Sequence, residues 1–271
     1  YNAQADLMPL FGSIDAKNTF KARVAAACGA KVEDLLGTDL FLYSRVQPAV
    51  WGKDGEFVSA GRLDDLECAY TTARAMIECK ATKGMPVLAV FDNEEVGSTT
   101  KQGADSTFLT DVLRRAALCL GVGGEAFYRA QASSVMLSCD NAHAAHPNHP
   151  ELYDASNRVY MNEGIVIKES ANQKYTSDAV SAAIFRTVCE KAGVPFQYYA
   201  NRADMPGGST LGNIANTQVS LNTVDIGLPQ LAMHSTYETA GAKDTEYMVS
   251  ALRLFYEHAL CMESDGEYVF E

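Results

Sequence analysis

The segment "VLAVFDNEEVGSTTKQGADS", residues 87–106, places an apolar run directly before two adjacent carboxylates, Glu94 and Glu95. The run at residues 87–91 follows a glycine and a proline, a pattern typical of a strand that is covered on both faces in an α/β sheet. Neighbouring carboxylates repel each other where hydration is poor, so solvent, a cation or a shared proton must compensate them. The segment therefore predicts a buried strand that ends at a charged site.

Helical and strand patterns alternate along the rest of the chain. This alternation predicts an α/β fold with a mainly parallel sheet flanked by helices, whose site lies where polar residues follow the strand ends. The predicted helices cover residues 15–28 (N-cap Asp15), 64–81, 106–120, a segment from its cap Ser177 to Gly193, and a last helix capped by Asp244. The other predicted strands cover residues 134–138, 165–167, 196–199 and 223–226.

Composition excludes several classes of function. The chain has 271 residues, 47% of them hydrophobic, and a net charge of −12. This charge, together with the lack of a recognisable basic face in the sequence, argues against binding to nucleic-acid phosphates or to an acidic membrane surface. Its apolar runs are well short of the roughly 20 residues of a membrane helix. Seven cysteines, an odd number without a CxxC pair, are typical of reduced thiols. We expect a soluble, cytoplasmic protein.

Five segments place carboxylates or imidazoles near predicted strand ends or helix starts. A single Asp after a strand is usually a turn or cap residue, and "HAAHPNH" on its own could be a surface loop. Two double acids that each follow an apolar segment, however, need full solvation or a cation. Such a set suits Zn, Mn or Co, often as a pair of ions about 3.5–4 Å apart. The candidates are Asp64, Asp65, Glu94, Glu95, Asp140, His143, His146, His149, Asp204 and His234.

Long strings around these residues resemble one family of metallopeptidases. "RLDDL" (62–66), "VFDNEEVGSTTKQGADS" (90–106), "DNAHAAHPNHPE" (140–151), "VIKESANQKYTSDAV" (166–180), "RADMPGGSTLG" (202–212) and "VDIGLPQLAMHS" (224–235) occur in this order. Together they resemble the aspartyl aminopeptidase and vacuolar aminopeptidase I family nearly end to end. The resemblance implies a dinuclear metallo-aminopeptidase, with Zn as the expected metal and Mn or Co as alternatives.

The resemblance also implies a role for each matching residue. Asp64 would bridge two metal ions, Glu95 and His234 would complete the shell of one ion, and Asp140 would bind the other. Glu94 would be the general base that accepts a proton from the attacking water. Because dinuclear peptidases of this wider clan hold their bridging Asp by a cis bond, a cis peptide is expected between Asp64 and Asp65. Without metal, at least one of these carboxyls should have a raised pKa.

A second set of residues falls on family positions that contact substrate: His143, Lys168, Tyr175, Met205, Gly207 and Gly208. Lys168 follows the apolar run "IVI", so its ammonium could pair with an acidic side chain of the substrate, or it could be an exposed charge on an edge strand. The glycines would allow close approach of the backbone. His146 and His149 are expected to be loop or interface residues. The resemblance thus implies peptide substrates with an acidic N-terminal residue.

One departure from the family pattern concerns the N-terminal part. The family has a His-x-Asp motif upstream of an inserted dimerisation domain, but no histidine precedes Asp64 here. Residues 1–60 are expected to be the tail of that insert, and residues 61–271 the catalytic domain. Either the missing segment exists elsewhere, or this is an impaired relative that acts as a non-catalytic scaffold or subunit. For the substrate, a dinuclear aminopeptidase that prefers neutral N-terminal residues is the alternative to one that prefers acidic residues. The family also implies a homo-oligomer, a dodecamer built from dimers.

Overall fold

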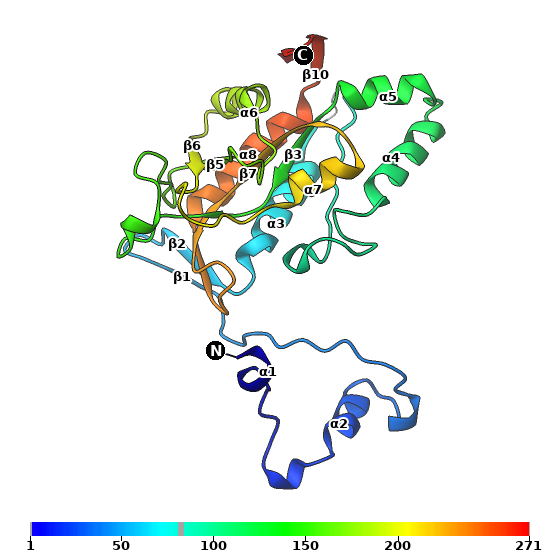
Figure 1. The fold of residues 1–271 in the computed structure, drawn as a ribbon, viewed down its shortest axis with the longest axis vertical. Coiled ribbons are helices and arrows are strands. Elements are labelled where there is room, and N and C mark those ends of the chain that lie inside the picture. The colour runs from blue at the N-terminus through cyan, green and yellow to red at the C-terminus, as the bar shows by residue number, and fades with distance from the viewer. Residues whose placement is uncertain (1, 81–83, 271) are drawn as a thin grey trace. The chain divides into compact units, whose positions relative to one another are not determined.

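A computed structural model describes residues 2–80 and 84–270, and its backbone contacts divide the chain into two compact units, residues 1–43 and 44–271. The first unit holds α1 (Ala3–Asp6), η1 (Ile14–Ala16), α2 (Phe20–Ala27) and η2 (Val32–Asp34) (Figure 1). The helix predicted from Asp15 is therefore too long: a separate 3₁₀ turn covers its first part, and α2 begins after Thr19. Ala25 is the only buried residue among the described part of this unit.

The second unit contains a four-stranded sheet in the order β3-β7-β5-β6. Two of its three pairings are parallel, β3 with β7 and β5 with β6, while β5 runs antiparallel to β7. The predicted strands at these four places are confirmed. Their bounds are β3 (Val135–Cys139), β5 (Ile165–Glu169), β6 (Phe196–Ala200) and β7 (Asn222–Gly227).

A five-stranded sheet has the order β1-β2-β9-β8-β4, and its pairings are antiparallel except for β4 with β8. In this sheet β2 (Phe57–Ala60) pairs with β9 (Glu238–Gly241), and the chain continues from β2 into helix α3 (Leu63–Glu78). A hairpin of β10 (Leu260–Ser264) and β11 (Glu267–Phe270) follows the last helix. The strands of the five-stranded sheet are β1 (Ala49–Trp51), β2 (Phe57–Ala60), β4 (Ala142–His143), β8 (Pro229–Leu231) and β9 (Glu238–Gly241).

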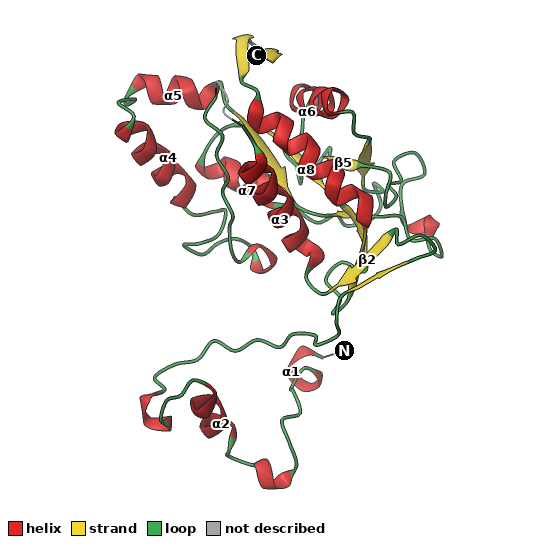
Figure 2. Cartoon of the chain, turned by 180° about the vertical axis from the view of Figure 1, so that it is seen from behind, coloured by secondary structure: helices red, strands yellow, loops and turns green. Residues whose placement is uncertain are grey.

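Helices cover the four-stranded sheet and confirm the α/β class. Figure 2 shows α3 and α8 side by side in front of the strands, whereas α7 lies in front of β3 in Figure 1. Across residues 2–80 and 84–270, every helix is too short or too polar to span a lipid bilayer. The helices of this unit are α3 (Leu63–Glu78), α4 (Phe108–Cys119), α5 (Glu125–Ala132), α6 (Ala179–Ala192), α7 (Leu211–Gln218) and α8 (Ala242–Glu257).

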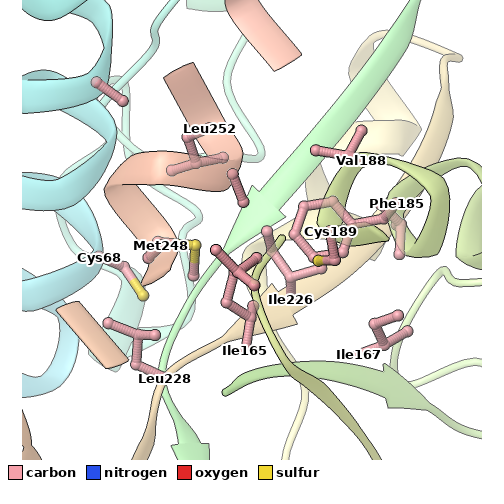
Figure 3. Packing of buried hydrophobic residues seen from close by; sticks show 14 of the residues in the cluster. Cys68, Ile165, Ile167, Phe185, Val188, Cys189, Ile226, Leu228, Met248 and Leu252 are labelled. Atoms are coloured by element: carbon pink, nitrogen blue, oxygen red, sulfur yellow. The ribbon is translucent and has the colours of Figure 1, made fainter. Parts of the chain in front are cut away.

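The main core lies between the sheet and helices α3, α6 and α8 (Figure 3). Ile165 and Ile167 of β5 point into it together with Phe185 of α6, and all three are fully buried. The intervening residue, Val166, belongs to a separate buried cluster on the other face of the strand. Because alternate residues of a strand point to opposite faces, both faces of β5 are covered, as its apolar sequence predicts.

The strand predicted at residues 87–91 is wrong. No strand is present there, and Val87 and Val90 are 46% and 59% exposed. An apolar run becomes a strand only where a neighbouring strand supplies hydrogen bonds, and in the described part of the chain no strand pairs with this one. The segment that follows it, however, forms the 3₁₀ turn η3 (Glu94–Val96) that carries the two carboxylates.

The predicted caps of α6 and α8 are wrong, whereas the predicted start of α3 agrees with the structure to within one residue. Helix α3 ends at Glu78, and the predicted end at residue 81 lies outside the described residues. The cap of α6 is Asp178, whose carboxylate accepts the Ser181 N–H, and not the preceding Ser177. The cap of α8 is Gly241, and Asp244 lies within the first turn. Its carboxylate instead accepts the N–H groups of Asn162, at 2.5 Å, and Gly164, at 2.9 Å.

We expect the substitution Asp244→Asn to change the pH dependence of stability. Burial raises the pKa of Asp244 to about 7, so the folded state binds a proton between about pH 4 and 7 that the unfolded state does not. As the pH rises from about 4 to 7, the free energy of unfolding should therefore fall by up to about 4 kcal/mol more in the wild type than in the variant. Urea unfolding at pH 4.5, 6 and 8 measures this; parallel pH profiles would contradict it.

Candidate metal centre

Four segments that are far apart in the sequence supply the carboxylates and the imidazole of one site. Asp64 lies in the first turn of α3, Glu95 lies in η3, Asp140 follows β3, and His234 follows β8. The peptide bond between Asp64 and Asp65 is cis, as expected. The site therefore draws on both sheets of the second unit.

His234 contacts two of the acidic side chains. Its Nε2 lies 3.0 Å from Asp64 Oδ2 and 3.0 Å from Glu95 Oε2. These three residues form one group whose ligand atoms all lie within 4.8 Å of one another, and Asp64, Asp65 and Asp140 form a second such group. Asp64 is thus common to both groups. Its side chain is only 4% exposed, whereas those of Glu95 and His234 are more than half exposed.

The acidic residues perturb one another, as expected for this cluster without a metal. Burial raises the pKa of Asp64 to about 8, and repulsion from Asp140 and Glu95 adds to the shift. Burial likewise raises the pKa of Asp65 well above its usual value. The pKa of the half-buried Glu94 is raised to about 7, first by burial and then by Asp140 and Glu95. The predicted raised carboxyl pKa is confirmed.

These residues fit a divalent metal ion. Carboxylate oxygens and an imidazole nitrogen are ligands that zinc accepts, and Asp64 Oδ1 is buried without a hydrogen-bond partner. An unpaired buried carboxylate oxygen is costly, and a cation would compensate it. The same cation would offset the repulsion between the acids, including that between the neighbouring carboxylates Glu94 and Glu95.

Lys168 is buried behind this cluster and is not an exposed edge charge. Its ammonium donates a hydrogen bond to the carbonyl of Asn141 at 2.7 Å and lies 3.6 Å from Asp140 Oδ2. It also lies 5.5 Å from the ring centroid of Tyr175, which is 5% exposed. The pKa of Lys168 is raised because Asp140 and other acidic groups outweigh the effect of burial. Lys168 and Tyr175 are therefore adjacent to the candidate ligands.

His143 also belongs to this neighbourhood. Desolvation lowers its pKa, and the positive charges of Lys168 and His234 lower it further. A lowered pKa keeps the imidazole neutral at pH 7, so one ring nitrogen can donate a hydrogen bond and the other can accept one.

Other candidate residues have no described contact with the cluster. Asp204 is exposed and pairs with Arg202 at 2.5 Å. The rings of His146 and His149 are neighbours, with centroids 5.4 Å apart and ring planes tilted by 40°. The loop that holds Met205, Gly207 and Gly208 connects to the site indirectly, because Thr210 after it donates to Asp225 Oδ1 at 2.7 Å. The backbone N–H of Thr176, next to Tyr175, donates to the other oxygen of Asp225 at 2.6 Å.

Sequence reasoning missed three buried residues that support the site: Asp225, Asn141 and Glu238. Asp225 accepts hydrogen bonds from Thr176 and Thr210, which are close in sequence to the predicted substrate residues Tyr175 and Gly208. The backbone carbonyl of Asn141 accepts a hydrogen bond from the Lys168 ammonium, and its backbone N–H donates to Asp65 Oδ1 at 3.2 Å. Glu238 accepts the backbone N–H groups of Asp64 and His234. The only signal in the sequence was that Asn141 and Glu238 lie within four residues of candidate ligands.

Comparison with known proteins gives a consistent result. A family model described as aminopeptidase I zinc metalloprotease (M18) matches residues 11–256. The probable M18 family aminopeptidase 2 of Clostridium acetobutylicum is 45% identical over 259 residues, which cover 94% of this chain and 60% of that protein. Its namesake from Mycobacterium leprae is 39% identical and covers 93% of this chain and 59% of its own length. The chain thus spans about three fifths of these relatives.

Solved structures agree with this similarity. The crystal structure of prApe1 has a TM-score of 0.82 at 28% identity and covers 94% of this chain and 56% of its own. The M18 aminopeptidase of Thermotoga maritima has a TM-score of 0.78 at 25% identity and covers 92% and 57%. The dodecamer of S. cerevisiae mApe1 has a TM-score of 0.77 at 27% identity and covers 92% and 58%.

Proposed function

Because the chain belongs to the M18 family of aminopeptidase I zinc metalloproteases, we propose that it acts as a metal-dependent aminopeptidase on peptides. The observation that carries the proposal is the convergence of Asp64, Glu95 and His234, with Asp64 shared by a second group that contains Asp140. Under this proposal two divalent ions, with zinc as the expected metal, would be held by these residues. Asp64 would be shared by both ions, Glu95 and His234 would hold one, and Asp140 would hold the other.

The protein groups would divide the reaction between them. Bound zinc would act as a Lewis acid that polarises the peptide carbonyl and lowers the pKa of water. Glu94 does not belong to either group of ligand atoms, so its carboxylate is available to accept a proton from the attacking water and to donate it to the leaving amine. His143 and Tyr175 would contact the substrate.

One experiment tests the activity and the alternatives to it. Metal analysis of the purified chain should find about two ions per chain, and hydrolysis of aspartyl, glutamyl and leucyl p-nitroanilides should be metal-dependent. Faster turnover of the two acidic substrates supports the proposed preference, whereas faster turnover of the leucyl substrate supports a neutral-residue aminopeptidase. The absence of turnover on all three, with bound metal, contradicts the peptidase proposal for this chain.

We expect the substitution Lys168→Met to weaken the binding of acidic substrates more than that of neutral substrates. If a substrate carboxylate reaches the ammonium, which is 2% exposed and lies 3.6 Å from Asp140 Oδ2, its loss removes a charge-assisted contact worth about 1.5–3 kcal/mol, so KM for aspartyl and glutamyl substrates should rise about tenfold or more. KM for the leucyl substrate should change much less. Lys174→Met, at an exposed lysine of the same segment, is the matched control. An equal rise in KM for all three substrates would contradict an acidic-residue pocket.

A second candidate function is binding without turnover, as a scaffold or subunit. It is favoured by the composition of the two groups of ligand atoms, which among the described residues contain four carboxylates and the single imidazole of His234. One ion or none, together with no hydrolysis, would support this function. Two ions with turnover would exclude it.

We also propose that the chain forms a homo-oligomer. The S. cerevisiae relative of known structure is a dodecamer, and the first unit of this chain exposes large apolar side chains. Leu10, Leu36 and Phe41 are 93%, 98% and 88% exposed, which favours burial against another subunit. The assignment of residues 1–60 to a dimerisation insert belongs to this proposal. Light scattering coupled to gel filtration measures the oligomeric state directly.

A further inference from the structure

The Glu238 carboxylate connects two candidate ligands of the metal centre, Asp64 and His234. It is the first residue of β9 and only 2% exposed. Its Oε2 accepts the backbone N–H of Asp64 at 3.0 Å, and its Oε1 accepts the backbone N–H of His234 at 2.7 Å. Asp64 and His234 are separated by 170 residues in the sequence. A single carboxylate therefore fixes the backbone of two candidate ligands relative to each other.

The surroundings of Glu238 hold it in a fixed position. Its backbone is part of β9, where it pairs with Ala60 of the antiparallel neighbour β2. His234 has a φ of +67°, a left-handed conformation that is unfavourable for residues other than glycine. The hydrogen bond to Glu238 stabilises this conformation and thereby fixes the direction in which the imidazole leaves the backbone. The imidazole then reaches both Asp64 and Glu95.

We infer that Glu238 is a positioning residue of the metal centre: it sets the distance between the Asp64 carboxylate and the His234 imidazole before any ion binds. The inference rests on the proposed metal site and adds to it a residue that contributes no ligand atom. Groups outside the ligand shell that orient the ligands commonly change metal affinity by about 10–100-fold when they are replaced. Replacing Glu238 should therefore change the affinity for the metal ions and not a proton-transfer step of the reaction.

Glu238→Gln is the sharpest test. A carboxylate accepts with both oxygens, whereas a carboxamide has one accepting oxygen and one NH₂ donor, so one of the two backbone N–H groups would face another donor. Zinc affinity, measured by competition with a chromophoric chelator, should fall about 10–100-fold. Glu238→Asp keeps both acceptors on a shorter side chain and should give an intermediate loss, which also supplies a result if the glutamine variant does not fold.

Asp244→Asn is a matched control. Asp244 is equally buried, and its carboxylate also accepts two backbone N–H groups, but those of Asn162 and Gly164, which are not candidate ligands. Its zinc affinity should stay within twofold of the wild type whatever its stability. The stabilisation that saturating zinc gives in thermal unfolding should likewise shrink in Glu238→Gln and persist in Asp244→Asn.

The outcomes separate this inference from the proposed function. Wild-type binding of zinc with a selective loss in Glu238→Gln supports both. Wild-type binding with affinity within twofold in both Glu238 variants overturns the inference and leaves the proposed metal site intact. Equal losses in the Glu238→Gln and Asp244→Asn variants also overturn it, because they indicate a general structural effect. A wild-type chain that binds no zinc refutes the proposed site, and the inference with it.

Discussion

Replacing Glu94 with glutamine is expected to lower kcat by about two to four orders of magnitude while the metal content stays unchanged. Glu94 does not belong to either group of ligand atoms, so its loss should not release an ion. Its carboxylate is half-buried beside Asp140 and Glu95, which raise its pKa in the metal-free chain after burial does, so it lies within the cluster without being one of the candidate ligands. Glutamine keeps the shape of the side chain but cannot accept the proton from water.

The measurement combines kcat, KM and metal analysis on the same preparation. KM should change little, because the residues proposed to contact the substrate, His143, Lys168 and Tyr175, are unchanged. Glu125→Gln, at an exposed residue in the first turn of α5, controls for a glutamine substitution that lies outside the site. A Glu94→Gln variant with near-normal kcat would refute the role of general base, and one without metal would show that Glu94 is a ligand instead.

Much of the fold was predictable because long periodic segments carry their own signal. Helices α3 and α6 lie within a few residues of the predicted ranges, since each has an apolar face at helical spacing. The segment at residues 87–91 shows the limit of this approach. Its apolar sequence fits a buried strand, but strand formation depends on a hydrogen-bonding neighbour elsewhere, and composition carries no information about that neighbour.

The candidate ligands were predicted from a resemblance and not from spacing. Nothing in the distance between Asp64 and His234 along the sequence indicates that they meet, whereas the strings around them match one family. Glu238 and Asp225 were missed for the converse reason. A single acid within or beside a strand usually faces solvent or a turn, and only the tertiary contacts show that these two acids accept backbone N–H groups from distant segments.

Asp64→Asn is expected to remove metal and to stabilise the metal-free protein at the same time. Asp64 is common to both groups of ligand atoms, and an amide neither carries the charge nor coordinates two ions as a carboxylate does, so the variant should retain one ion at most. Without metal, burial and then repulsion from Asp140 and Glu95 raise the pKa of Asp64 to about 8, so at pH 7 the folded chain must take up a proton that the unfolded chain does not bind. An amide is neutral in both states and avoids this cost, so the metal-free variant should unfold a few degrees above the metal-free wild type.

The opposite signs of these two effects make the test specific. Thermal unfolding with and without zinc, together with metal analysis, should show a wild type that is strongly stabilised by zinc and a variant that zinc affects little. Asp54→Asn, at an exposed carboxylate, should change neither quantity. A variant that keeps two ions would contradict the bridging role. A metal-free variant less stable than the wild type would show that Asp64 is held for structural reasons, because acids assembled for a cation should destabilise the fold until the cation binds.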